Sequence, residues 1–271
     1  MTGGAAHRLG WLSALSTLWR GAPAATEASD LSGRLPQSQT TVYAVGDIHG
    51  RLDLLLRLEA MIKADIDRTN PASSLLVFLG DYVDRGPASR GVLELLASRA
   101  AICTEEVFLR GNHEQVLLDF LSQPDILESW SQFGGLETLF SYGLRPRLPL
   151  AESAKHELQT QFNAALPPQH LAFLQRTRLS YETPTQFFVH AGINPQLPLA
   201  QQKPADLLWI RDEFLNVTRR FEKLIVHGHT PVAEPEILSN RINVDTGADI
   251  TGRLTCAVLE GTSCRILATG R

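Results

Sequence analysis

The chain has 271 residues and a mass of 29.8 kDa, which fits one large domain or two small ones. Hydrophobic residues make up 44% of it and charged residues 20%, so it can bury a full core without disulfides or a structural metal. The formal net charge of −4 supplies no basic field for a phosphate backbone, which argues against a nucleic-acid partner.

The first 39 residues differ in composition from the rest of the chain. Residues 22–39 are rich in Ala, Ser, Pro and Gln without apolar periodicity, which predicts a mobile linker. Residues 9–19 contain leucines and two tryptophans, but this run is too short to span a bilayer and too weak for a secretory signal. We therefore predict a flexible tail over residues 1–39, no transmembrane segment, and a single catalytic domain over residues 40–271.

From residue 40 onward, strand-like apolar runs alternate with helical patterns. Three short strands are predicted at Thr41–Val45, Ser74–Leu79 and Val107–Leu109, each followed closely by a glycine. Apolar residues at helical spacing predict a helix over Arg51–Ile66 and a shorter one over Gly91–Ser98. Strand, polar loop, helix and strand in this order indicate a parallel sheet with right-handed crossovers.

The middle of the chain is less regular than its two ends. We interpret residues 117–185 as a mostly helical insertion rather than a second domain. Short apolar runs then return and predict five more strands, at Gln186–Val189, Leu224–Val226, Arg241–Val244, Leu254–Leu259 and Arg265–Leu267. Because turn residues separate these closely spaced runs, we expect a second, more antiparallel sheet.

The three cysteines are Cys103, Cys256 and Cys264, an odd number without C-x-x-C spacing. This argues against a disulfide framework or a thiolate zinc site, and it favours a reducing, cytoplasmic compartment. Cys256 and Cys264 lie in apolar strand-like runs, where we expect small buried side chains.

Five short polar segments follow apolar runs, at the strand ends where α/β folds place their ligands. They read GDIHG (46–50), GDYVDRG (80–86), GNHE (111–114), VHAG (189–192) and VHGHT (226–230). Each offers an oxygen or imidazole ligand beside a glycine that lets the backbone turn tightly. One Asp or His at a strand end is usually structural, but five such segments in order predict a shared site.

The candidate ligands are Asp47, His49, Asp81, Asn112, His190 and His229. Mixed oxygen and nitrogen donors without a thiolate suit Mn²⁺, Fe or Zn²⁺. Six ligands are too many for one catalytic ion with open positions, but they suffice for two ions that share one carboxylate. Such a pair keeps an excess positive charge that attracts phosphate, and it lowers the pKa of a bound water. We expect two divalent ions, with Mn²⁺ as the preferred metal and Fe or Zn²⁺ as the alternatives.

In order and spacing, these segments resemble the motifs of the phosphoprotein phosphatase family of calcineurin-like metallophosphoesterases. The likeness is greatest to the bacterial and phage serine/threonine phosphatases, and it covers the chain from about Tyr43 to Thr230. The resemblance implies an α/β fold in which a two-sheet β-sandwich is flanked by helices. It also implies that Asp47 and His49 hold the first metal, that Asp81 bridges both metals, and that Asn112, His190 and His229 complete the second.

The resemblance further implies roles for four residues that are not ligands. Arg85 would grip the phosphate, because its guanidinium fork matches two phosphate oxygens. Arg211, in LLWIRDEF, matches a second phosphate-binding arginine of the bacterial members. His113 would donate a proton to the leaving alkoxide, and Asp84 would accept from the other ring nitrogen and hold the tautomer.

Other residues near the motifs are interpreted as structural. His227 points to the opposite face of an extended strand from His229, and Glu114 is expected to interact with a helix dipole. Asp245 caps a turn or bonds a ligand histidine. The aromatic residues Trp130, Phe133 and Tyr142 are interpreted as core, with a substrate groove as the alternative, and His7, His156 and His170 as surface residues.

The leading hypothesis is an enzyme, a bacterial-type serine/threonine protein phosphatase. In this hypothesis a metal-activated hydroxide attacks phosphorylated proteins in line, and the enzyme acts as a monomer.

The first alternative is a symmetrical dinucleoside tetraphosphate (Ap4A) hydrolase. Relatives with that activity typically read GNHD and lack the acid that matches Asp84, whereas this chain has both GNHE and Asp84. The second alternative, a metal-bearing binding module, usually lacks ligands or the His–Asp pair, which are present here. The choice between phosphoserine and phosphotyrosine stays open.

Overall fold

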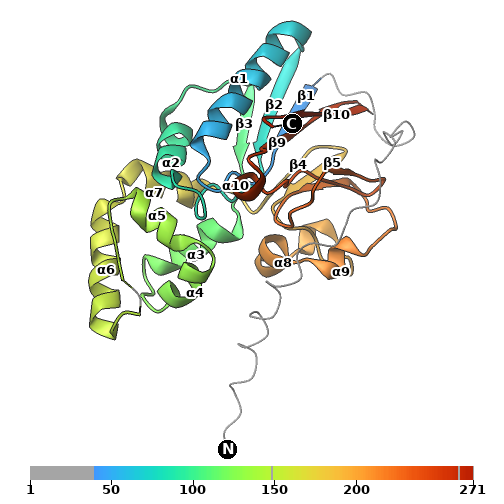
Figure 1. The fold of residues 1–271 in the computed structure, drawn as a ribbon. Coiled ribbons are helices and arrows are strands. Elements are labelled where there is room, and N and C mark those ends of the chain that lie inside the picture. Colours follow the sequence, from blue (N-terminus) through green and yellow to red (C-terminus); the bar gives the residue numbers. More distant parts are fainter. Residues whose placement is uncertain (1–39, 148, 262, 271) are drawn as a thin grey trace, which may run out of the picture.

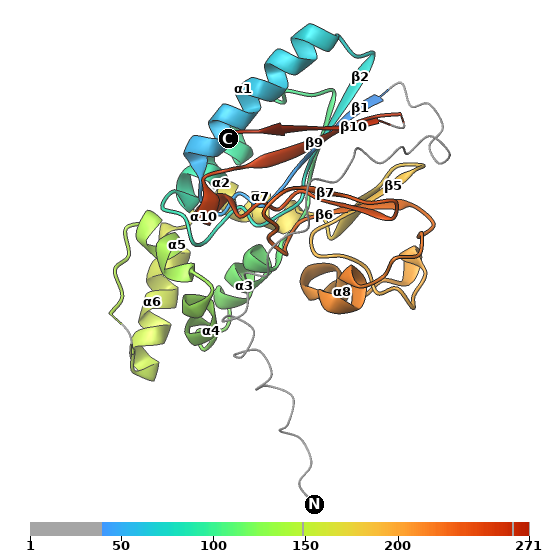
Figure 2. The ribbon, with the colours of Figure 1, turned by 45° about the vertical axis from the view of Figure 1, so that its right-hand side comes forward.

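The computed structural model describes residues 40–147, 149–261 and 263–270, so the predicted tail lies outside the described residues. Over these ranges, two five-stranded sheets pack together with helices on their outer sides (Figures 1 and 2). This is the two-sheet sandwich flanked by helices that the resemblance implies.

The first sheet has the strand order β10-β9-β1-β2-β3. Its strands are β1 (Thr40–Val45), β2 (Ser73–Phe78), β3 (Glu105–Phe108), β9 (Thr255–Glu260) and β10 (Ser263–Ala268). As predicted, β1, β2 and β3 run parallel. The expectation that the last two strands join the second sheet is wrong, since β9 pairs antiparallel with β1. The reason is that β9 is apolar on both faces, and the edge beside β1 buries both of them.

The second sheet has the order β4-β5-β6-β8-β7. Its strands are β4 (Ser180–Glu182), β5 (Gln186–Val189), β6 (Leu224–His227), β7 (Glu236–Ile237) and β8 (Arg241–Asn243). It is mixed rather than mainly antiparallel, because β5, β6 and β8 run parallel and only the two edge strands are antiparallel. The edge strands β4 and β7 were not predicted, since two or three residues carry no readable alternation.

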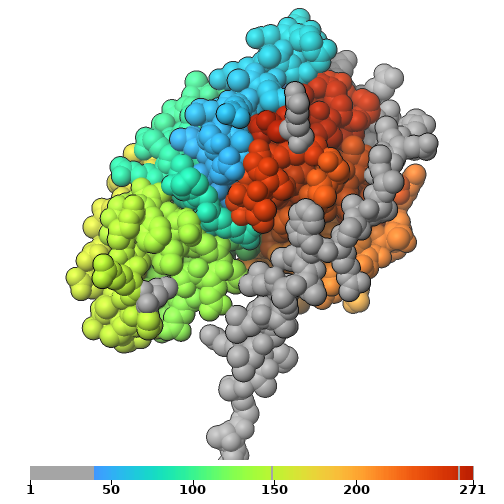
Figure 3. Space-filling view, viewed as in Figure 1, coloured from blue at the N-terminus to red at the C-terminus, as the bar shows by residue number. Residues whose placement is uncertain are grey.

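The helices cover the two outer faces and fill the long connection between β3 and β4. They are α1 (Leu52–Thr69), α2 (Ser89–Ser98), α3 (Asn112–Phe120), α4 (Ile126–Gln132), α5 (Gly135–Ser141), α6 (Glu152–Ala165), α7 (Pro168–Arg176), α8 (Pro204–Trp209), α9 (Asp212–Leu215) and α10 (Ala248–Thr251), with a 3₁₀ turn at Leu199–Gln201. Helices α4 to α7 form a lobe beside the first sheet, coloured yellow-green in Figure 3. Among the helices that the structure describes, none combines the length and the hydropathy of a membrane-spanning segment.

Alternating side chains of the strands build the layers of the core. In β1, Val42 and Ala44 face the second sheet, whereas Tyr43 and Val45 face the helices. In the second sheet, Val226 faces the first sheet and Ile225 packs under α8 and α9. Each fully buried Val or Ile side chain contributes about 1.5–3 kcal/mol. The packed sandwich therefore fixes the strand ends from which the site is built.

His170 is buried, so its interpretation as a surface residue is wrong. Its Nδ1 lies 2.7 Å from the Tyr142 hydroxyl, and its Nε2 lies 2.9 Å from a carboxylate oxygen of Glu94. These two partners satisfy both ring nitrogens, which removes the cost of burying the imidazole. The contacts tie α7 and the end of α5 to α2. His156 is exposed as expected, Cys256 is buried and Cys264 half-buried, and His7 lies outside the described residues.

Candidate active site

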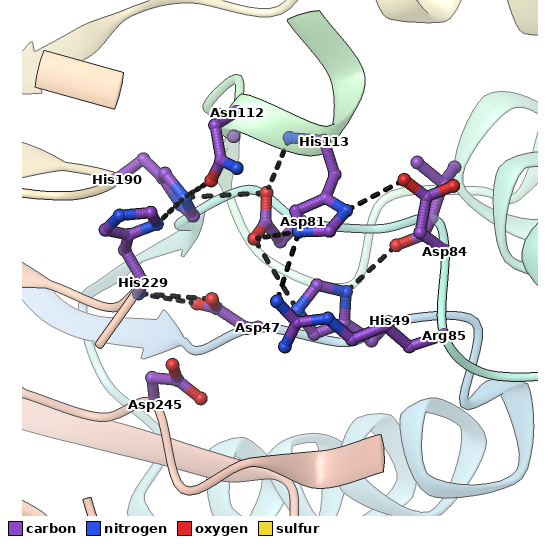
Figure 4. A network of polar contacts seen from close by, with 12 residues as sticks. Asp47, His49, Asp81, Asp84, Arg85, Asn112, His113, His190, His229 and Asp245 are labelled. Atoms are coloured by element: carbon purple, nitrogen blue, oxygen red, sulfur yellow. Dashed lines mark hydrogen bonds and ion pairs between the residues drawn. The ribbon is translucent and has the colours of Figure 1, made fainter. Parts of the chain in front are cut away.

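Each candidate ligand lies just after a strand of one of the two sheets. Asp47 and His49 follow β1, Asp81 follows β2, Asn112 begins α3 after β3, and His190 and His229 follow β5 and β6. Figure 4 shows these side chains pointing toward one centre, with Asp81 in the middle. Both sheets therefore supply candidate ligands to the same site.

The loops that carry these residues have strained backbones. Six described non-glycine residues have positive φ, and five of them belong to the site: His49, Asp81, Asp84, Arg85 and His229. This conformation costs on the order of 1–3 kcal/mol per residue and persists only where the surroundings hold it. Such clustering at one place is typical of a functional site.

Two motif glycines leave room for the acidic ligands. A Cβ atom at Gly111 would overlap the carboxylate of Asp81, and one at Gly228 would overlap the carboxylate of Asp47. Neither glycine can be replaced without displacing the neighbouring acid. The glycines beside the ligand residues are therefore explained by close packing as well as by turn geometry.

Asp81 lies between two groups of potential ligands. Its Oδ2 is 3.5 Å from Nε2 of His49, and its Oδ1 is 3.5 Å from Nε2 of His190. One group joins Asp81 to His49 and His113, the other joins it to His190 and His229, and ligand atoms within each group lie within 4.8 Å of one another. The two oxygens of Asp81 thus face two adjacent positions for a cation.

The second group is an arrangement that suits a bound cation. Nδ1 of His190 donates to the carbonyl of Leu79 at 3.0 Å, which leaves Nε2 without a proton. Burial lowers the pKa of His190, so the ring stays neutral. Its bare Nε2 lies 2.9 Å from the amide oxygen of Asn112 and 3.2 Å from Nδ1 of His229. Two acceptors in contact repel each other unless a positive charge lies between them, so these residues fit a bound metal ion.

The first group has the same design around His49. Its Nδ1 donates to the carbonyl of Val83 at 2.9 Å, and Nε2 therefore faces Asp81 as an acceptor. Asp47 lies beside it, and its carboxylate accepts the backbone N–H of His229 at 3.1 Å. Burial, followed by the charges of Asp245 and Asp81, raises the pKa of Asp47. A buried cluster of three acids is costly without compensating positive charge, and divalent ions would supply it.

His113 lies between the acids and an arginine. Its Nδ1 is 2.8 Å from Oδ2 of Asp84, and its Nε2 is 3.3 Å from a guanidinium nitrogen of Arg85 and 3.8 Å from Oδ2 of Asp81. Burial opposes the charged ring, but the Asp81 charge and the Asp84 hydrogen bond outweigh it and raise the pKa of His113. A ring held at Nδ1 with Nε2 facing the site is suited to donating a proton.

Both predicted phosphate-binding arginines reach the site. The Arg85 side chain is exposed and extends toward His113 (Figure 4). Arg211 is half-buried at the start of α9, with a guanidinium nitrogen 3.4 Å from the Thr230 hydroxyl. Burial lowers the pKa of Arg211. The negative charges of Asp245 and Asp81 oppose this shift, whereas the positive charge of Arg85 adds to it. The structure thus places two cations beside the acidic centre.

Glu114 does more than interact with the helix dipole. Its buried carboxylate accepts backbone N–H groups of Asp81 at 2.8 Å, Tyr82 at 2.7 Å and Gly111 at 2.9 Å. These bonds join the GDYVDRG loop to the GNHE loop. A glutamate three residues after Gly111 predicts the bond to the backbone N–H of Gly111 at the start of α3. The sequence carries no signal for the bonds to the GDYVDRG loop.

His227 and Asp245 have structural contacts. Nδ1 of His227 donates to the carbonyl of Gly228 at 3.1 Å, and its ring packs on Phe214. Burial lowers the pKa of His227 to about 3, so it is neutral. Asp245 accepts the backbone N–H of Gly247 at 2.9 Å and caps that turn, and burial raises its pKa to about 6.

The helical insertion contributes residues that sequence reasoning did not assign to the site. Trp130 is buried as expected, but its indole N–H donates to Asp84, and so does the hydroxyl of Thr138. Phe133 lies against His113 and against Trp209, with ring centroids 6.2 and 6.1 Å apart. Phe133 thus faces the site, whereas Tyr142 belongs to the core. The only sequence signal is the pair of glycines between Trp130 and Thr138.

Residues 40–258 match the family model described as calcineurin-like phosphoesterase, and the chain therefore belongs to that family. It is accordingly a phosphoester hydrolase of a family with a dinuclear metal centre, and its histidines and aspartates are positioned to bind metal.

Its relatives differ in the substrates that their names give. Serine/threonine-protein phosphatase 1 of Salmonella typhimurium is 32% identical over 224 residues, 81% of this chain and 92% of that protein. The asymmetrical bis(5′-nucleosyl)-tetraphosphatase PrpE of Anoxybacillus flavithermus is 28% identical over 234 residues, 78% of this chain and 87% of that protein. The crystal structure of a cold-active protein tyrosine phosphatase shares the fold, with a TM-score of 0.51, 18% identity and coverage of 88% and 82%.

Proposed function

We propose that this phosphoesterase is a serine/threonine protein phosphatase. The observation that carries the proposal is the contact of 2.8 Å between Nδ1 of His113 and Asp84, with Nε2 facing the site. The alkoxide that leaves phosphoserine is a strong base and needs a proton, whereas the nucleotide that leaves a dinucleoside tetraphosphate needs none. A held proton donor is therefore expected in a protein phosphatase. The 32% identity to a serine/threonine phosphatase supports the same choice.

The metal ligands in this proposal are Asp47, His49, Asp81, Asn112, His190 and His229. Two divalent ions, most simply Mn²⁺, would lower the pKa of a water for attack and neutralise phosphate oxygens. Asp81, with an oxygen toward each group, would hold both ions. The neutral amide of Asn112 would bind without cancelling the positive charge.

The remaining roles belong to the chain's own side chains. Arg85 and Arg211 would bind the phosphate oxygens through charged hydrogen bonds. His113 would give the proton on Nε2 to the leaving serine oxygen, while Asp84 keeps Nδ1 protonated and the ring in place. We further propose that the enzyme works in the cytoplasm as a monomer, and its free cysteines agree with a reducing compartment.

The decisive experiment compares substrates on the purified protein with Mn²⁺. We expect kcat/KM for phosphoserine and phosphothreonine peptides to exceed that for diadenosine tetraphosphate by about tenfold or more. Asp84→Asn is the matched variant, since it should slow phosphoserine hydrolysis and spare the dinucleotide. A tenfold preference for the dinucleotide would establish a tetraphosphatase instead, and the 28% identity to a tetraphosphatase named as asymmetrical supports that activity rather than the symmetrical one. A phosphotyrosine peptide in the same panel tests the choice between serine and tyrosine.

A further inference from the structure

We infer that Trp130 and Thr138 are positioning residues, which hold the Asp84 carboxylate so that it orients His113 for proton transfer. The inference rests on the proposed function, since it requires His113 to be the proton donor. It makes the helical segment from α4 to α5 part of the active site, although this segment contains no predicted ligand.

The Asp84 carboxylate is held from three directions. Its Oδ2 accepts the indole N–H of Trp130 at 2.8 Å and Nδ1–H of His113 at 2.8 Å. Its Oδ1 accepts the hydroxyl of Thr138 at 2.6 Å. The backbone N–H of Asp84 donates to the hydroxyl of Thr138 at 2.9 Å and to the hydroxyl of Ser89 at 3.0 Å. Asp84 is completely buried, so no water competes for these bonds.

Asp84 needs this support because its own loop does not provide it. The residue has φ of +70° and lies between strand and helix, where no regular hydrogen bonding fixes the backbone. The terminal torsion of an aspartate is broad, and a carboxylate with one partner can rotate. Two further donors at different oxygens remove that freedom. Both donors are neutral, so they orient the carboxylate without pairing its charge.

The indole of Trp130 is itself fixed by packing. Its ring lies on Phe120 and Phe162, with centroids 5.0 and 5.8 Å away. A Cβ atom at Gly135 would overlap the indole, so only glycine fits there. One residue earlier, the carbonyl of Gly134 accepts the backbone N–H of Arg85 at 3.0 Å. The segment from Trp130 to Thr138 therefore holds both Asp84 and the adjacent phosphate-binding arginine.

A buried indole N–H usually finds an acceptor, so a purely structural role is the competing explanation of the bond to Asp84. The two roles differ in their dependence on the leaving group. A residue that positions the proton donor affects substrates whose leaving group needs a proton, whereas a packing residue affects all substrates alike. The experiment compares a phosphoserine peptide with p-nitrophenyl phosphate, whose phenolate leaves with little protonation.

Trp130→Phe and Thr138→Val each remove one donor to Asp84 and keep most of the side-chain volume. We expect each to lower kcat on the phosphoserine peptide by about tenfold. The loss of kcat on p-nitrophenyl phosphate should stay below about threefold. Bound metal, measured by elemental analysis, should be unchanged. Phe162→Leu is the packing control, because it changes a ring that contacts Trp130 and leaves the indole N–H in place. Thr138→Ser is the second control, because it retains the hydroxyl. Each control should change kcat on the two substrates by the same factor.

His113→Asn, measured beside them, separates failure of this inference from failure of the proposed function. If His113→Asn shows the leaving-group dependence while Trp130→Phe and Thr138→Val slow both substrates equally, the positioning role is wrong and the proposed function stands. If His113→Asn itself lacks that dependence, the proton donor and this inference are both wrong. Should Trp130→Phe not fold, as judged by thermal melting, Thr138→Val decides.

Discussion

Two parts of the candidate active site are built differently: the metal side, which comprises the six candidate ligands, and the proton-donor side, which comprises the proposed proton donor His113 and its partner Asp84. The candidate metal ligands come from loops that follow strands of both sheets, and each loop motif is four to seven residues long. Asp84 comes from one of these loops, but its carboxylate is held by Trp130 and Thr138, which are 46 and 54 residues further along the chain. The sandwich builds one side, and the helical insertion completes the other.

This difference implies that the two sides can be disrupted separately. Ligand positions depend on strand ends that are fixed by the buried core of the sandwich. The proposed proton donor, His113, depends through Asp84 on contacts between the insertion and a single loop. Damage to the metal side should remove metal and slow the hydrolysis of every substrate. Damage to the proton-donor side should leave metal bound and slow the hydrolysis only of substrates whose leaving group needs a proton.

The largest effect is expected on the metal side, for Asp81→Asn. Its two oxygens face both ligand groups, so loss of its charge weakens both metal positions. We expect kcat/KM to fall by at least about 10³-fold for every substrate, and chelation of the native enzyme to abolish activity until Mn²⁺ is restored. Asp47→Asn should lower kcat/KM less than Asp81→Asn does, because Asp47 serves only one of the two metal positions. Elemental analysis measures the effect, and an Asp81→Asn enzyme that keeps two ions per chain would contradict the bridging role.

The next effect belongs to the proton-donor side, for His113→Asn. We expect kcat on a phosphoserine peptide to fall by about 10²–10⁴-fold, with both metals retained, and a smaller loss on p-nitrophenyl phosphate. His190→Asn is the matched histidine on the metal side, and it should lose an ion and slow both substrates alike. His113 lies in a group with His49 and Asp81, so loss of an ion from His113→Asn would identify it as a ligand instead.

The same division explains how much could be predicted from the sequence. The ligand loops were predicted because each motif is contiguous and follows a strand with a clear apolar pattern. The bonds from Trp130 and Thr138 to Asp84 were not, since they join a loop to helices in a segment without motifs. A buried indole is predicted by its size alone, but its acceptor is set by tertiary packing.

Packing also decided the other differences from the expected structure. The hairpin β9–β10 joins the first sheet because both faces of β9 are apolar, a choice that depends on what covers each face. His170 is buried because Tyr142, just after α5, and Glu94 in α2 satisfy its ring. Glu114 bonds a loop more than thirty residues earlier in the chain. Each of these contacts joins distant segments, and a single sequence carries no signal for them.

A smaller effect is expected for Gly134→Ala, which tests the contact between the insertion and Arg85. Gly134 has φ of +93°, and an added Cβ would lie 2.8 Å from the backbone nitrogen of Arg85. We expect displacement of Arg85 to raise KM by about tenfold, since a charged phosphate contact is weakened. Gly143→Ala is the control, with φ of +89° and nothing within 4 Å of the added Cβ. Both should lose about 1–2 kcal/mol of stability from the left-handed conformation. An equal KM for the two variants would contradict the role of Gly134.

The smallest effect on catalysis is expected for His170→Ala, inside the insertion but away from Asp84 and Arg85. The substitution leaves the buried Tyr142 hydroxyl without its partner at 2.7 Å, and the end of α5 loses its tie to α7. We expect the free energy of unfolding, measured in urea, to fall by about 1–3 kcal/mol. The kcat of the folded enzyme should be unchanged on both a phosphoserine peptide and p-nitrophenyl phosphate, because the contacts of Trp130 and Thr138 remain. A selective loss on phosphoserine would instead mean that the insertion acts on the proton donor as one rigid unit, and that its stability and its catalytic contribution cannot be separated.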